Sequence, residues 1–435
     1  MDAIGIDIGS TSIKGAVLHV DSRCLGTPVA RRFPAPLAGL PAGHVEIDPR
    51  AVSDTVADVL TGLVAAHPGV GAVYLSSQMG GLLLLDGHGR PRTNYLSWRD
   101  ERSAAGEAGS TLACVRAAWE RHGDLLTLGS ELQAGSATSL AAWLATHGHL
   151  PDGATLAGIG EAVAAGLVGE RVPMHATAAI GLLDLERGGW HHEALGRIGL
   201  ESLHLPALAT SEAPVGTTVV AGRRLEVHGP YGDQPCALRG AGLAPDELSL
   251  NISTGSQVSR LARAFAPGPY QTRRAFDGMF LDTVTHLPAG RSLELLVDLL
   301  VDVAAAEGVS LTAPWESIQR RVAAVADTDL DVDLAFFPGP LGAHGSVRGI
   351  TTGNLTVGSL FLAAYRAMAD AYACVAARFG PVAWREVVVS GGLVRRTPRL
   401  RALLAERFVA PLRESPEEET LLGLLDIACE NAPAP

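Results

Sequence analysis

The segment AIGIDIGSTSIKGAV, residues 3–17, decides the fold of this chain of 435 residues. It begins as an apolar run rich in β-branched residues, passes through the small polar stretch Gly9–Ser12, and continues as a second apolar run. Two such runs around a glycine-containing turn predict a pair of antiparallel strands. The backbone N–H groups of a turn with small side chains can hold phosphate oxygens. On these residues alone, an ordinary hairpin turn explains the segment as well as a phosphate site does.

The segment NISTGSQVSRL, residues 251–261, repeats this pattern in the second half of the chain. It too reads as a strand, a polar residue, a turn of Ser, Thr and Gly, and a second strand. Apolar spacing predicts helices over residues 51–66, 292–307 and 358–379, and short buried strands over 71–76 and 387–390. Strands and helices mixed in both halves are typical of layered α/β domains. Two related halves with facing turns would enclose a cleft.

A stretch rich in Pro and Gly, residues 205–235, separates the two halves. We therefore predict a first domain over residues 1–222 and a second over residues 223–435. The second contains VVVSGGLVRRTP, residues 387–398, in which a buried strand ends at two glycines and a helix follows. Glycines there would let a flat base or a ribose lie against the backbone, although a plain strand-to-helix turn has the same pattern.

The composition excludes several classes of protein. With 47% apolar residues the chain is not disordered, and its net charge of −12 disfavours nucleic acid as a partner. No uninterrupted apolar run reaches the roughly 18 residues that a membrane span needs, and the acidic N-terminus does not resemble a signal peptide. Five scattered cysteines without a metal-binding spacing fit free thiols in the cytoplasm. Lys14 is the only lysine in the chain.

The three small-residue segments, in this order, resemble those of the FGGY carbohydrate kinases, which belong to the superfamily of actin, hexokinase and the Hsp70 ATPase. The resemblance extends from about Ala3 to about Ile427 and implies two ribonuclease-H-like α/β domains with a cleft between them. It further implies a reaction in which ATP phosphorylates a sugar hydroxyl. A carboxylate before the first turn, Asp7, can hold Mg²⁺. By this resemblance the ATP phosphates and adenosine contact Gly9, Ser10, Thr11, Thr254, Gly255, Gly391 and Gly392.

Two further segments resemble the sugar side of the family's site. In SSQMGG, residues 76–81, Gln78 and Met79 align with the family sequence Gly-Gln-Met-His-Gly. In SWRDERS, residues 97–103, Trp98 and Asp100 match Trp-x-Asp-x-Arg, where the tryptophan packs on the sugar and the aspartate accepts bonds from its hydroxyls. A carboxylate suits this task because it accepts several O–H bonds. The residues alone equally allow a core tryptophan and a surface aspartate.

The segment HGPYGDQPCALRG, residues 228–240, resembles the family stretch whose aspartate is the general base, which assigns this role to Asp233. The base would accept the proton of the attacking sugar hydroxyl. Without the resemblance, Asp233 reads as the N-cap of a short helix. The N-terminus of that helix would keep the carboxylate ionised.

Two departures from the family pattern affect the expected substrate. Gly80 stands where the family has histidine, and Ser253-Thr254-Gly255 replaces Gly-Thr-Ser. The second turn and residues 277–296 look most like sedoheptulokinases and then xylulokinases, so sedoheptulose or D-xylulose is the expected acceptor. These departures also leave open an inactive sugar- or nucleotide-binding regulatory protein of the same fold. An ATPase switch or filament protein is a third alternative. The resemblance is compatible with a homodimer.

Overall fold

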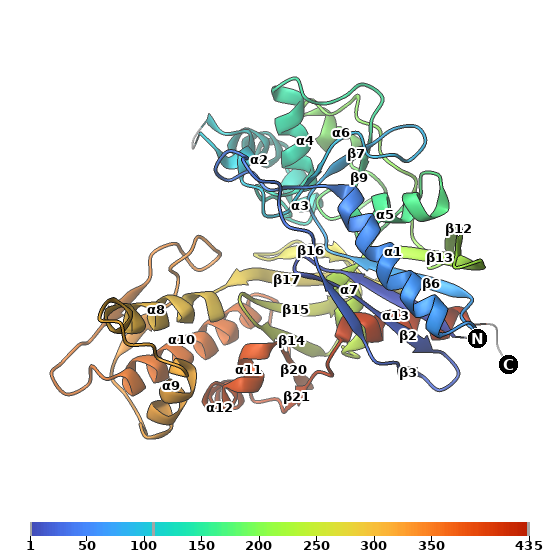
Figure 1. The fold of residues 1–435 in the computed structure, drawn as a ribbon. Coiled ribbons are helices and arrows are strands. Elements are labelled where there is room, and N and C mark those ends of the chain that lie inside the picture. Colours follow the sequence, from blue (N-terminus) through green and yellow to red (C-terminus); the bar gives the residue numbers. More distant parts are fainter. Residues whose placement is uncertain (1, 107–108, 433–435) are drawn as a thin grey trace.

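The same strand arrangement organises both halves of the molecule (Figure 1). The computed structural model describes residues 2–106 and 109–432. In the first half, β1 (Ala3–Ile8) pairs antiparallel with β2 (Ser12–His19) and parallel with β6 (Ala72–Ser77). In the second half, β14 (Glu247–Ile252) pairs antiparallel with β15 (Ser256–Ala262) and parallel with β20 (Glu386–Ser390). The repeat predicted from the sequence is therefore confirmed as a repeated unit of structure.

Each of these units forms the centre of a mixed sheet. The first sheet has the order β12-β13-β6-β1-β2-β3, with β4 also paired to β2, and the second has the order β16-β17-β15-β14-β20-β21. The remaining strands of the two sheets are β3 (Cys24–Leu25), β4 (Val29–Arg32), β12 (Pro214–Val220), β13 (Arg223–Gly232), β16 (Gln271–Arg274), β17 (Phe280–Leu287) and β21 (Leu412–Glu414). Four two-stranded pairs join β5 (Glu46–Ile47) to β8 (Tyr95–Leu96), β7 (Leu83–Leu85) to β9 (Thr155–Ala157), β10 (Met174–His175) to β11 (Leu208–Ala209), and β18 (Asp331–Asp333) to β19 (Ser346–Arg348).

Helices cover the sheets, as expected for a layered α/β fold. In the first half they are α1 (Pro49–Ala66), α2 (Thr111–His122), α3 (Asp124–Thr127), α4 (Ala137–Thr146), α5 (Ile159–Val168) and α6 (His192–Gly196), with the 3₁₀ turn Arg102–Ala104. In the second half they are α7 (Asp233–Gly240), α8 (Gly290–Ala306), α9 (Pro314–Ala323), α10 (Val357–Ala377), α11 (Gly392–Arg396), α12 (Pro398–Arg407) and α13 (Glu419–Asn431). The three helices predicted from apolar spacing correspond to α1, α8 and α10.

The helix α10 is a core element of the second half. Among the described residues it is the one helix long and apolar enough to cross a membrane by length and composition, and 56% of its most apolar window is buried. Its side chains Phe361, Tyr365 and Tyr372 pack in one apolar cluster with strands β14 and β20. The apolar length of α10 therefore reflects burial inside the second domain.

Strand pairing does not follow the predicted domain boundary. The boundary between residues 222 and 223 falls in the turn that joins β12 to β13, and both strands belong to the first sheet. The last helix also returns to the first half, where Leu421, Leu424 and Ile427 pack with Ala16 and Leu18 on one face of the first sheet. The sheets favour a domain boundary after β13, with α13 counted as an element of the first domain.

The helices α7 and α13 cross at unusually short range. A Cβ atom on Gly240 of α7 would lie 1.9 Å from the carbonyl oxygen of Glu419, and one on Gly423 of α13 would lie 2.0 Å from that of Cys236. Only glycine allows such backbone contact. Arg239 of α7 also pairs with Asp426 of α13 at 2.7 Å. The crossing brings the N-terminal residues of both helices to the space between the two sheets.

Replacing Gly423 by alanine tests this crossing. The added methyl group must push α13 away from the Cys236 carbonyl, and overpacking of this kind costs about 1–3 kcal/mol. We expect Gly423→Ala to lower the midpoint of thermal unfolding by several degrees, measured by circular dichroism.

The matched control is Gly166→Ala in α5, where a Cβ would meet no atom within 4 Å. Alanine is favoured over glycine in a helix by roughly 1 kcal/mol, so this variant should be slightly more stable than the parent. Equal effects of the two substitutions would contradict the crossing as a close backbone contact.

Candidate active site

A cleft of about 590 Å³ opens between the two halves, within the usual size range for small-molecule sites. The residues that line it come from both sheets and from the N-termini of α7 and α13. The lining residues include Ser10, Gln78, Met79, Gly80, Trp98, Glu131, Ile180, Asp233, Gln234, Ser253, Gly255, Arg273 and Glu419. Seven of these were not predicted as site residues from the sequence.

The first predicted phosphate turn connects β1 to β2 at the edge of this cleft. The Gly9 N–H donates to the Ser12 carbonyl at 3.1 Å, which closes the turn. The Gln78 side chain donates to the Gly9 carbonyl at 3.4 Å. Ser10 lines the cleft, while Thr11 is exposed. The turn and the predicted sugar-side residue Gln78 are therefore direct neighbours.

The second predicted phosphate turn is held by the start of α8. The carbonyls of Ser253 and Thr254 accept hydrogen bonds from Gly290 N–H at 3.0 Å and Arg291 N–H at 2.8 Å. Ser253 and Gly255 line the cleft, and Thr254 is exposed. With its carbonyl groups engaged by α8, the turn is fixed in position.

The predicted adenosine segment lies against the second turn. Gly391 has φ of 97°, a backbone conformation that favours glycine, and a Cβ there would lie 2.3 Å from the Ile252 carbonyl oxygen. Gly392 is the first residue of α11 and is exposed. Gly391 thus contacts the end of β14, and neither glycine is among the residues that line the cleft.

Asp7 is the last polar residue of β1 before the first turn, and its Oδ1 atom is buried without a hydrogen-bond partner. Burial raises the pKa of the Asp7 carboxyl to about 7, the charge of Asp233 adds to this rise, and Lys14 opposes it. Lys14 itself pairs with Glu418, beside the start of α13, at 2.7 Å. A buried carboxylate oxygen without a partner is costly, so Asp7 is suited to bind a cation or a hydrogen-bond donor.

Asp233 is the first residue of α7 and faces the cleft. The N-cap position belongs to Gly232, so the alternative interpretation of Asp233 as the N-cap is wrong. Burial raises the pKa of Asp233 to about 6, while the Gln234 N–H bond to its Oδ1, at 2.8 Å, and the positive charge of Arg273 limit the rise. The expected effect of the helix N-terminus is thus outweighed by burial, but the carboxyl group remains mostly ionised at neutral pH.

A buried polar network beside Asp233 joins the two halves across the cleft. Arg273 of β16 donates from Nε to Glu131 of the first half and from Nη1 to the side-chain oxygen of Gln234. Gln234 also donates to Ser259 at 3.3 Å. Nothing in the local sequence around Glu131 or Arg273 marks them as partners, because 142 residues separate them.

The predicted sugar-side residues separate into two groups. Gln78, Met79 and Trp98 line the cleft, whereas Asp100 does not. Asp100 is fully buried, and its carboxylate accepts from the Val45 N–H at 2.6 Å and from Arg102 Nη2 at 2.8 Å. It is not the surface residue allowed by the sequence either. In this structure Asp100 anchors the segment that carries Trp98 and has no free face toward the cleft.

Among residues 2–106 and 109–432, no group of three or more His, Cys, Asp or Glu side chains is placed to hold a metal ion. Any cation in the cleft would therefore depend on one or two carboxylates together with ligands from a bound substrate. Mg²⁺ is commonly held in this way.

Comparison with solved structures defines the class of protein as a two-domain sugar-kinase fold. Gluconate kinase from Lactobacillus acidophilus matches with a TM-score of 0.85 at 17% identity, over 98% of this chain and 88% of that one. Xylulose kinase from Rhodospirillum rubrum matches with a TM-score of 0.83 at 19% identity, over 98% and 90%. Glycerol kinase from Plasmodium falciparum, solved with ADP, matches with a TM-score of 0.80 at 13% identity, over 98% and 88%.

The sequence establishes the family. Residues 3–225 match the N-terminal domain of the FGGY family of carbohydrate kinases, which is more than half of the chain. The protein belongs to that family. No curated protein matches its sequence.

The raised pKa of Asp7 predicts how the stability of the protein depends on pH. Between the ordinary pKa of 3.8 and about 7, the folded protein holds a proton that the unfolded chain has released, so this group's contribution to stability falls as pH rises. Asparagine cannot ionise. We expect the stability of Asp7→Asn relative to the parent to increase by about 2–3 kcal/mol between pH 5 and pH 8.

Chemical denaturation at both pH values measures this difference. The control is Asp48→Asn, since Asp48 is the N-cap of α1 and lies outside the cleft. That substitution should not produce a growing advantage at high pH. An Asp7→Asn variant whose stability relative to the parent does not increase between pH 5 and pH 8 would contradict the buried-charge account.

Proposed function

We propose that this protein is an ATP-dependent carbohydrate kinase that phosphorylates a hydroxyl group of a ketose or polyol, with sedoheptulose or D-xylulose as the expected acceptor. One observation carries the proposal. Asp233 lies on the same cleft as the sugar-side residues Met79 and Trp98 and as the turn residues Ser10 and Ser253. A proton acceptor placed between a polyol site and two phosphate-binding turns is what phosphoryl transfer to a hydroxyl requires.

In this mechanism Asp233 accepts the proton of the attacking hydroxyl. A bond then forms between the sugar oxygen and the γ-phosphorus of ATP, the bond from that phosphorus to the bridging oxygen breaks, and ADP leaves. A carboxyl group with a pKa of about 6 is ionised enough to act as the base at neutral pH. Positioning contributes most of the rate in such transfers. Arg273 limits the pKa of Asp233, and through Gln234 it holds the start of α7 in place.

The two turns would hold the ATP phosphates from opposite sides of the cleft, and Gly391 would lie along the adenosine. Asp7 fits a magnesium site, because its buried Oδ1 atom has no partner within the protein. Mg²⁺ bound there would neutralise charge on the phosphates. Lys14, held by Glu418, adds a positive charge close to Asp7. Asp100 would act as a positioning residue that keeps Trp98 at the sugar.

Asp233→Asn should remove phosphoryl transfer while leaving ATP binding nearly intact. Asparagine keeps the shape of the side chain but cannot take up the hydroxyl proton. Loss of a general base typically costs about 10²–10⁴-fold in rate. We expect kcat to fall by at least 100-fold, with the Kd for ATP changed less than about threefold in isothermal titration calorimetry.

The pH profile provides the control for this assignment. In the parent, kcat/KM for the sugar should rise as pH increases through about 6, since Asp233 must be ionised. A variant that keeps more than a tenth of the parent activity would remove Asp233 from the role of base.

The function itself is tested by ADP release at fixed Mg·ATP against a panel of acceptors. The panel contains sedoheptulose, D-xylulose, D-ribulose, L-ribulose, D-fructose, glycerol, erythritol and, because of the structural neighbours, gluconate. A steep dependence on one acceptor supports the kinase. Slow turnover without any acceptor dependence would favour an ATPase, and ATP binding without turnover would favour the regulatory protein.

We expect the protein to act in the cytoplasm on small molecules, without nucleic acid or membrane as partners. This expectation rests on the acidic net charge, the unpaired pattern of cysteines and the nature of the proposed substrates. A homodimer is compatible with the family, and sedimentation would determine the oligomeric state.

A further inference from the structure

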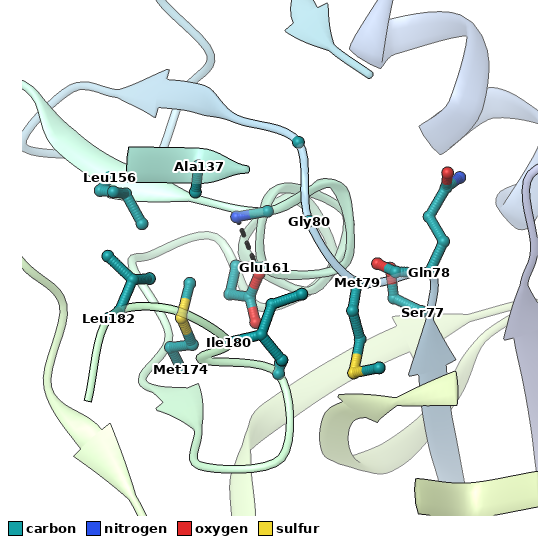
Figure 2. A pocket seen from close by; sticks show the side chains of 13 residues that line it. Ser77, Gln78, Met79, Gly80, Ala137, Leu156, Glu161, Met174, Ile180 and Leu182 are labelled. Atoms are coloured by element: carbon teal, nitrogen blue, oxygen red, sulfur yellow. Dashed lines mark hydrogen bonds between the residues drawn. The ribbon is translucent and has the colours of Figure 1, made fainter. Parts of the chain in front are cut away.

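A second, smaller cavity lies next to the predicted sugar-side residues Gln78 and Met79 (Figure 2). It shares Gln78, Met79, Gly80 and Ile180 with the cleft, so these residues form the wall between the two spaces. The cavity has a volume of about 20 Å³, enough for one water-sized group. It is therefore a side pocket of the proposed sugar site that one small group could enter.

The pocket holds one carboxyl group, and apart from Ser77 and Gln78 the side chains that line it are apolar. Glu161 of α5 is only 3% exposed, and its Oε2 atom accepts the Gly158 N–H at 2.9 Å. Its Oε1 atom is buried and has no hydrogen-bond partner. Figure 2 shows this second oxygen pointing away from Gly158, into the space lined by Met174 and Ile180. Glu161 caps α5 through its Oε2 atom. This capping role does not account for the Oε1 atom.

An unpaired carboxyl oxygen in apolar surroundings is expensive, and a ligand would remove that cost. Burial raises the pKa of Glu161 to about 7, so both of its protonation states are populated near neutral pH. The ionised form accepts a hydrogen bond and the neutral form can donate one. A hydroxyl group can pair with both forms, whereas an anion can pair only with the neutral form and an apolar group with neither.

At Gly80 the wall between the pocket and the cleft consists of backbone alone. This residue has no side chain, and its φ of 77° favours glycine. A Cβ there would lie 3.1 Å from the Trp98 Cβ, on the side of the predicted sugar contact. Met79 belongs to the same wall, and its sulfur lies against Gly232, next to the proposed base.

We propose that Glu161 is a specificity-determining residue whose Oε1 atom binds the hydroxyl of a hydroxymethyl group of the acceptor sugar, with that hydroxyl inserted into this pocket beside Gly80. Met79 and Ile180, which line both the pocket and the cleft, would pack on the methylene, and the carboxyl group would pair with the hydroxyl. This inference rests on the proposed sugar kinase function. It restricts the substrate to sugars and polyols that carry a second hydroxymethyl group besides the phosphorylated one.

The test compares acceptors that differ by this single oxygen. The pairs are D-xylulose with 1-deoxy-D-xylulose, and glycerol with 1,2-propanediol. A hydrogen bond to a charged group corresponds to about 10- to 100-fold in affinity. For the parent protein, kcat/KM should therefore favour the hydroxylated member of at least one pair by that factor.

Two substitutions at Glu161 give different expectations. Glu161→Met fills the same volume without a polar atom, so the preference for the hydroxylated acceptor should fall to about one or reverse. Glu161→Gln keeps an oxygen for the Gly158 N–H and should give an intermediate preference. KM for ATP should stay within about twofold in both variants.

Glu247 provides the matched control. It is 2% exposed and accepts the Ala244 N–H at 3.0 Å, the same three-residue spacing as Glu161, but it lies outside the cleft. Glu247→Gln weakens its ion pairs with Arg385 and Arg413, so it should lower stability without changing the acceptor preference.

The outcomes separate this inference from the proposed function. The parent and both Glu161 variants could phosphorylate a sugar with the same preference between the two members of an acceptor pair. That result overturns the inference alone, because Glu161 is then only a helix cap. If the protein shows no turnover, calorimetry without nucleotide measures whether it binds the two members of each acceptor pair differently. A preference in binding that Glu161→Met abolishes supports the inference without the kinase, and a parent that neither binds nor phosphorylates any acceptor overturns both.

Discussion

The close crossing of α7 and α13 is the contact on which the proposed site depends. Gly240 and Gly423 let two backbones touch where any side chain would separate them. The first residues of these helices, Asp233 and Glu419, consequently both line the cleft. Because α13 packs on the first sheet and α7 leads into the second, the crossing also ties the two halves together beneath that cleft. Helix packing thus helps to set the position of the proposed base.

Three carboxyl groups around the cleft share one electrostatic property. Asp7, Asp233 and Glu161 all have pKa values raised by burial, to about 7, 6 and 7. Two of them also keep an oxygen without a partner. Each such group lowers the stability of the folded protein at neutral pH. The ionised carboxylate loses its contacts with water on burial, and the protein does not replace them with enough hydrogen bonds or opposite charges. A cation at Asp7, a hydroxyl proton at Asp233 and a sugar hydroxyl at Glu161 would each offset that cost, and the free energy regained would contribute to binding.

Some expectations changed when distant segments came together. Asp100 carries the residue type that suits a polyol, but Arg102 and the Val45 N–H occupy its oxygens. The Pro- and Gly-rich stretch, residues 205–235, indicated the boundary between the two domains, yet it holds β12 and β13, which complete the first sheet. In both cases the residue types were identified correctly and the partners were not, because a pattern along the chain does not specify which donor or strand lies next to it.

The sequence by itself determined the elements whose cause is local. Alternating apolar residues around a turn of small residues specify the hairpins at β1–β2 and β14–β15, apolar spacing specifies α1 and α10, and the order of these segments identifies the family. Tertiary structure alone decided which groups meet. The bridge from Glu131 through Arg273 to Gln234 and the unpaired oxygen of Glu161 depend on packing between segments far apart in the chain. The physical reason is that strand and helix propensities act over a few residues, whereas burial, and with it pKa and hydrogen-bond pairing, is a property of the assembled core.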